Sequence, residues 1–114
     1  MLRILCAALL VLTLCSPADA ASYTCGRYLK TLFPSLPKGI NYNLALEWRR
    51  LPRTEARPGA VVVQRRKGRA LGGGPGGHVS KILEVRGSCR ALVRDNRGVY
   101  ERNICHALVA YVQP

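Results

Sequence analysis

The spacing of apolar residues predicts two helices in the first half of the chain. From Ser22 onward, apolar side chains recur at helical spacing and share one face: Tyr28, Leu29, Leu32 and Phe33. Ser22 or Thr24 can cap the start of this helix, and Pro34 ends it. A second short helix is predicted over residues 41–51, where the apolar positions again line up: Leu44, Trp48 and Leu51.

After Pro58 the pattern changes to short β-branched and alternating segments. These segments, separated by turn signals, predict strands over residues 59–66, 78–85, 89–96, 99–104 and 106–112. A glycine-rich, basic loop over residues 67–77 joins the first two. Helices followed by consecutive strands with tight turns indicate an α+β domain, with two N-terminal helices packed on a small twisted antiparallel sheet.

Residues 1–20 have the pattern of a secretory signal peptide. Arg3 supplies a positive start, residues 4–14 are apolar, and Ala18-Asp19-Ala20 ends in a small-x-small cleavage pattern. The apolar run is too short to span a bilayer comfortably, and no later run is long enough. We therefore expect a single domain over residues 21–114 of a secreted or periplasmic protein without a transmembrane segment.

The chain is strongly basic, with a net charge of +12 from 18 Lys and Arg against 6 Asp and Glu. Basic residues cluster at 49–53 and 64–69, and such a charge draws a domain to polyanions. No aromatic residues interleave with the clusters, and no DNA-binding motif is present, so no specific nucleic-acid partner is expected. We expect a monomer whose basic surface binds anionic envelope polymers. The alternative is that the basic surface has no partner.

The cysteine count predicts one disulfide and one free thiol. The chain has five cysteines, and Cys6 and Cys15 leave with the signal peptide, so an odd number remains. Cys89 and Cys105 both stand at the start of a predicted strand, and a disulfide can join them if those strands are neighbours. This partition leaves Cys25 free, although Cys25 can also be an inert buried thiol or pair with another cysteine.

Cys25 and His78 stand where a nucleophile and its base are found. Cys25 opens the first helix, where free backbone N–H groups and the helix dipole stabilise a thiolate. His78 begins a strand and can accept the thiol proton, although a surface histidine at a strand edge is the alternative. Asp95 and Asn96 end the next strand and lie on opposite faces, so only one of them can orient the imidazole.

Four segments in this order, TCGRYLKTL, PGAVVVQRR, GGHVSKILEV and ALVRDNRG, resemble the NlpC/P60 and CHAP group of papain-like cell-wall amidases and endopeptidases. In that group a cysteine opens a helix, a Pro-Gly strand follows, a His-Val strand carries the histidine, and the next strand ends in the third polar residue. The resemblance implies a papain-like core with Cys25 as nucleophile, His78 as base, and Asn96 or Asp95 as the orienting residue.

The sequence departs from the family pattern at some positions. Ser80 stands where the family usually has glycine, and Ala60 stands where it usually has aspartate. No side chain ahead of Cys25 is a clear oxyanion-hole donor, so the backbone N–H of Cys25 takes that role. We expect the oxyanion hole and the substrate cleft to include Tyr23, Thr24, Gly76 and Gly77, the glycines leaving room for an extended peptide.

The function expected from these features is that of an exported cysteine peptidase or amidase acting on peptide bonds of the cell wall (peptidoglycan). The alternative is a catalytically inactive basic protein on the same scaffold that binds anionic envelope polymers. A third class, a small inhibitor or toxin, has no positive signature here. No cofactor or metal is expected, because the cysteines and histidines lack the spacing of zinc ligands, and His106 is expected to be structural.

Overall fold

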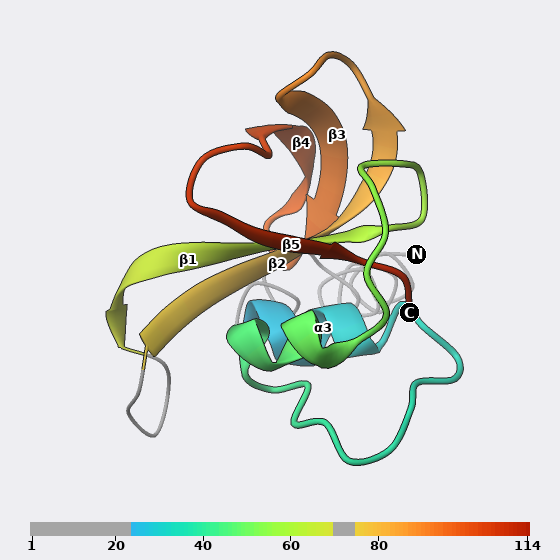
Figure 1. Ribbon diagram of the computed structural model, residues 1–114, viewed down its shortest axis with the longest axis vertical. Helices are drawn as coiled ribbons and strands as arrows, with labels where there is room; N and C mark the ends of the chain where they lie inside the picture. Colours follow the sequence, from blue (N-terminus) through green and yellow to red (C-terminus); the bar gives the residue numbers. More distant parts are fainter. Residues whose placement is uncertain (1–23, 70–74) are drawn as a thin grey trace, which may run out of the picture.

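The computed structural model describes residues 24–69 and 75–114. The main element of the fold is a five-stranded antiparallel sheet with the strand order β4-β3-β2-β1-β5 (Figure 1). The chain pairs β1 with β2, β2 with β3 and β3 with β4, and then returns so that β5 pairs with β1. The strands are β1 (Val61–Arg69), β2 (Pro75–Val85), β3 (Arg90–Asp95), β4 (Gly98–Asn103) and β5 (Leu108–Val112).

The β1–β2 hairpin reaches into the segment predicted as a glycine-rich loop. β1 continues to Arg69 and β2 begins at Pro75, so both strands are longer than the sequence indicated. The hairpin extends well beyond the rest of the sheet (Figure 1). Gly76 permits this close pairing, because a Cβ there would lie 2.8 Å from the carbonyl oxygen of Gly68.

The sheet buries apolar side chains on both faces. Val61 and Val63 of β1 pack with the two short helices, whereas Val62 packs on the opposite face with Ile82 and Val93. Successive strand residues point to opposite faces, so a strand covered on both sides becomes a continuous apolar run. The run of three valines at the start of β1 is therefore a consequence of its central position.

The predicted α+β class, two N-terminal helices packed on a sheet with a papain-like core, is wrong for the described residues. The helices described are short: the α-helix α3 (Cys25–Lys30) and the 3-10 helix η1 (Ala45–Arg50). α3 ends before the apolar pattern does, and Pro34 and Pro37 follow it closely. The apolar spacing of residues 44–51 fits a tighter 3-10 turn as well as an α-helix.

Although short, α3 and η1 lie side by side against the sheet (Figure 1). Trp48 of η1 is completely buried, and its indole N–H donates to the carbonyl oxygen of Tyr42 at 2.9 Å. A Cβ at Gly26 would collide with that same carbonyl oxygen, so only glycine lets α3 approach this closely. This packing fixes the start of α3 next to β2.

Cys89 and Cys105 form a disulfide, as predicted, and Cys25 is free. The strands that bring the two half-cystines together differ from those expected: Cys89 precedes β3 and Cys105 follows β4, so the bond closes the open end of that hairpin. Among the described residues, no helix has the length and apolar character needed to cross a membrane. The predicted signal peptide, residues 1–20, lies outside the described part of the chain.

Candidate active site

Cys25 lies beside an edge of β2 that none of the described strands covers. β3 ends at Asp95, and the part of β2 from Gly77 to Val79 continues past that end. The start of α3 occupies this space, and the Cys25 thiol donates to the carbonyl oxygen of Gly77 at 3.8 Å. The backbone N–H of Val79 hydrogen-bonds to the same sulfur. Because β2 extends past the end of β3, its uncovered edge leaves space for the Cys25 thiol.

His78 and Asp95 form a buried pair next to this thiol. Nε2 of His78 lies 2.7 Å from Oδ2 of Asp95, and the side chains are 3% and 0% exposed. An ionised carboxylate only accepts hydrogen bonds, so Nε2 carries the proton and Nδ1 is the nitrogen left to interact with Cys25. The sequence left both Asp95 and Asn96 open as the residue that orients the imidazole, and Asp95 is the one that contacts it.

The carboxylate of Asp95 accepts hydrogen bonds from several further groups. Oδ2 accepts from the Tyr100 hydroxyl at 2.6 Å and from the Ser80 hydroxyl at 3.2 Å, and Oδ1 accepts from the backbone N–H of Arg97 at 2.9 Å. Burial alone would raise the pKa of Asp95, but the hydrogen bonds from His78, Tyr100 and Arg97 outweigh it and lower the pKa to about 2. Asp95 is therefore ionised at neutral pH.

The thiol and the imidazole shift one another toward an ion pair. Burial would raise the pKa of Cys25, but its hydrogen bond and charge interaction with His78 lower it below the usual value. Burial would likewise lower the pKa of His78, yet the hydrogen bonds to Asp95 and Cys25 raise it. A lowered thiol pKa and a raised imidazole pKa both shift the pair toward thiolate and imidazolium.

Two of the residues expected around the cleft serve the packing of the protein itself. A Cβ at Gly77 would lie 2.7 Å from two carbons of Leu46 and 3.3 Å from Cβ of Ala45, so this glycine lets η1 pack on β2. Gly76 lies against the backbone of Arg66 and Gly68 in the β1–β2 hairpin. The chain's own atoms thus occupy the space at both glycines.

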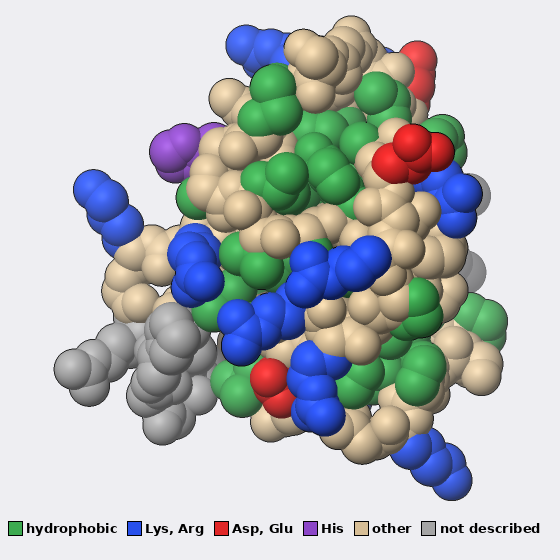
Figure 2. Space-filling view, in the orientation of Figure 1, with side chains coloured by type: hydrophobic (Ala, Val, Ile, Leu, Met, Phe, Trp, Pro, Cys, Tyr) green, Lys and Arg blue, Asp and Glu red, His purple; other side chains and the backbone are tan. Residues whose placement is uncertain are grey.

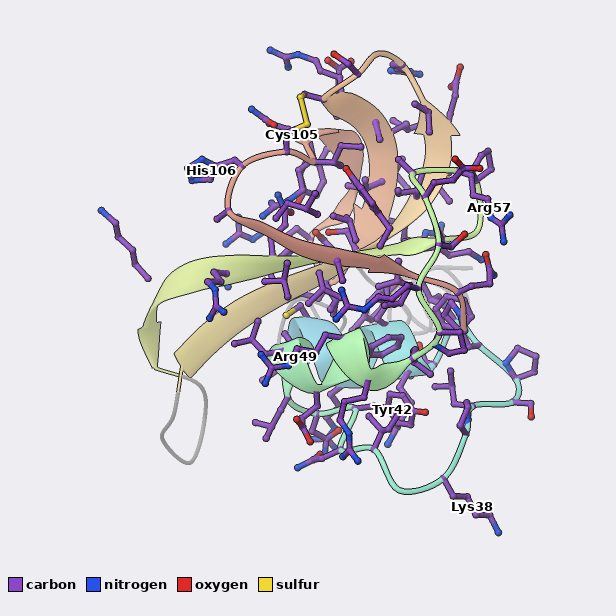
Figure 3. The ribbon with its side chains drawn as sticks, viewed as in Figure 1. Lys38, Tyr42, Arg49, Arg57, Cys105 and His106 are labelled. Atoms are coloured by element: carbon purple, nitrogen blue, oxygen red, sulfur yellow. A yellow bond between two sulfur atoms is a disulfide. The ribbon has the colours of Figure 1, made fainter. Side chains whose placement is uncertain are left out.

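The other predicted positions lie as follows. Thr24 caps α3, its hydroxyl oxygen accepting from the backbone N–H of Arg27 at 3.4 Å. Tyr23 lies outside the described residues. His106 is exposed on the segment before β5, next to Cys105, and points away from the sheet (Figure 3). It is not part of the Cys25–His78–Asp95 cluster.

Sequence reasoning missed the residues that support Asp95. Ser80 was noted only as a departure from the family pattern, although it follows His78 by two positions and so shares its face of the sheet. Tyr100 pairs with Val93, two residues before Asp95, and so lies on the same face of the sheet as the carboxylate. Strand alternation could have placed Ser80, but Tyr100 required the register of β3 against β4.

Comparisons with protein-family models, with curated proteins and with solved structures found no match. The chemical capacity of the site therefore rests on its geometry. A thiol beside an imidazole that is held by a buried carboxylate is the arrangement of a cysteine nucleophile with its general base. The base and its orienting group lie on adjacent strands, and the nucleophile lies on the helix that packs beside them.

Proposed function

We propose that the protein is an exported cysteine hydrolase, a peptidase or amidase, that cleaves peptide bonds of the cell wall. The observation that carries the proposal is the buried line of Cys25, His78 and Asp95, with 2.7 Å between the imidazole and the carboxylate. Structural ion pairs also shift pKa values, but here the imidazole held by the carboxylate also hydrogen-bonds to a free thiol.

The proposed reaction gives each of the three side chains a distinct role. The Cys25 thiolate attacks the scissile carbonyl carbon, and the imidazolium of His78 gives its Nδ1 proton to the leaving amine. His78 then takes a proton from water, and the resulting hydroxide cleaves the thioester and frees Cys25. Asp95 keeps the imidazole in the required tautomer throughout. In this proposal the backbone N–H of Cys25, in the first turn of α3, donates to the developing oxyanion.

The substrate class and the location are supported by features outside the cluster. The four motifs similar to NlpC/P60 and CHAP enzymes support action on peptidoglycan peptides. The Cys89–Cys105 disulfide supports an oxidising, extracytoplasmic location, which agrees with the signal-peptide pattern of residues 1–20. We propose secretion or a periplasmic location on these grounds.

The proposal is tested by incubating the protein with isolated peptidoglycan and measuring the new amino groups that hydrolysis releases. Cys25→Ser and His78→Gln should each abolish release, because one removes the nucleophile and the other its base. His106→Gln is the matched control, since it changes the exposed histidine and should keep full activity. Equal release by the wild type and by Cys25→Ser would overturn the proposed function.

A basic surface supports a second candidate function, the binding of anionic envelope polymers. Lys and Arg side chains outnumber Asp and Glu on the face shown in Figure 2. On β1, Arg65, Arg66 and Lys67 are exposed, and none of them belongs to an ion pair among the described residues. Exposed charges are screened by salt, so retention on an anionic polymer should fall steeply with ionic strength. Salt-sensitive retention without hydrolysis would favour binding over catalysis.

A further inference from the structure

The hydrogen bonds around Asp95 continue away from the catalytic cluster into β4. The hydroxyl of Tyr100 donates to Oδ2 of Asp95 at 2.6 Å and accepts from Nη1 of Arg102 at 2.9 Å. A hydroxyl has one proton, so the donation from Arg102 commits that proton to the carboxylate. Asp95 thus receives a hydrogen bond whose direction Arg102 fixes.

Arg102 is itself held by a side chain that has no freedom to turn. Nε of Arg102 donates to Oε1 of Gln64 at 2.7 Å. Gln64 is 2% exposed, and its Nε2 donates to the carbonyl oxygens of Asn103 at 2.9 Å and His106 at 2.8 Å. An inverted amide would set its oxygen against two carbonyl oxygens, so Oε1 must face Arg102. The guanidinium therefore has one defined position.

Arg102 is partly buried and has no acidic partner among the described residues. Ion pairs involving the arginines of the described residues join Arg50, Arg86 and Arg90 to Glu47, Glu84 and Glu101, and none includes Arg102. Its guanidinium is partly buried and is bonded to neutral groups, so its charge is neither paired nor fully screened by water. That charge lowers the pKa of His78.

We propose that Tyr100 and Arg102 are positioning residues that hold the Asp95 carboxylate against His78 and place a fixed positive charge beside the Cys25–His78 pair. Neither residue touches the reacting atoms; each acts through Asp95 or through its charge. The consequence for turnover rests on the proposed function, but the effect on His78 does not. Tyr100 and Arg102 therefore influence the titration of His78 whether or not a substrate is known.

The charged groups around His78 give the sign of the expected effect. Cys25 on α3 and Asp95 on β3 stabilise the imidazolium, and Arg102 on β4 opposes them. The side chains beside His78 on its own face of the sheet, Gln64 on β1 and Ser80 on β2, are uncharged. Removing the charge of Arg102 takes away an opposing interaction, so the pKa of His78 should rise.

NMR titration of the His78 ring protons, assigned with a His106→Gln variant, tests the proposal on the full protein. Arg102→Met should move the His78 titration to higher pH. Arg94→Met is the matched control, because it removes the same charge from an exposed position next to Asp95 and should leave the titration in place. Tyr100→Phe removes a single oxygen and should also move the titration upward, since Asp95 then directs more of its charge to His78.

The outcomes separate this proposal from the proposed function. A His78 titration unchanged in both Arg102→Met and Tyr100→Phe would overturn the positioning role, whatever the activity of the enzyme. An upward movement together with equal hydrolysis by the wild type and Cys25→Ser would keep the positioning role and reject the hydrolase. If Arg102→Met does not fold, the single-atom change in Tyr100→Phe decides alone. With hydrolysis established, both variants should lower kcat more than they raise KM.

Discussion

Replacing Asp95 with asparagine should remove a pH-dependent contribution to the stability of the fold. The pKa of Asp95 is about 2 in the folded protein, against an ordinary value of 3.8. Each pKa unit corresponds to about 1.4 kcal/mol, so the ionised carboxylate stabilises the fold by about 2 kcal/mol. Asp95 is completely buried, so solvent screening does not reduce this figure.

The direction of the effect follows from the lowered pKa. The contribution is complete above the unfolded-state pKa and is lost as the pH falls through the folded-state value, so about 2 kcal/mol should disappear between about pH 6 and about pH 2. Asp95→Asn cannot titrate, so its stability should lack this part of the pH dependence.

Urea denaturation of both proteins at a series of pH values measures the difference directly. Glu55→Gln is the control, because Glu55 is an exposed carboxylate outside the ion pairs of the described residues. It should keep the wild-type pH dependence. If wild type and Asp95→Asn lose stability in parallel as the pH falls, the hydrogen-bonded carboxylate described above is not present.

Two further predictions concern the parts of the fold that hold the site. Gly26→Ala should destabilise the protein by about 2 kcal/mol or more, because its Cβ collides with the backbone at Tyr42. Gly87→Ala is the control, since its Cβ would meet no atom nearer than 4.0 Å; equal urea midpoints would contradict the packing. Replacing Cys89 and Cys105 together by alanine should cost about 3 kcal/mol, given the 16-residue separation, and an unchanged thermal midpoint would refute this.

The sheet could be predicted from the sequence because its strands are marked by local signals. β-branched runs and turn dipeptides located all five strands to within a few residues, and the cysteine count indicated the disulfide. The helices were overestimated, since apolar spacing at residues 28–33 and 44–51 does not reveal how soon the backbone leaves the helical conformation. Packing against the sheet stabilises such short helices more than their own propensity does.

The cluster could be predicted only in part. Cys25 and His78 carry local signals, a helix start and a strand start, whereas the choice of Asp95 over Asn96 depends on which face of β3 turns toward His78. The sequence predicts Gly76 and Gly77 as part of the substrate cleft. In the structure Gly77 instead makes room for Leu46, a residue far from it in the chain. Tyr100, Arg102 and Gln64 depend in the same way on non-local strand register, which no single-sequence pattern contains.

The most direct test of the account is a pH titration of the Cys25 thiolate by its ultraviolet absorbance, taken as the difference between the wild type and Cys25→Ser. This measurement needs no reagent to reach the buried sulfur. The account predicts a midpoint below the usual thiol range, because His78 stabilises the thiolate, and a higher midpoint in His78→Gln. A wild-type midpoint at or above the usual range, unaffected by His78→Gln, would contradict the proposed nucleophile.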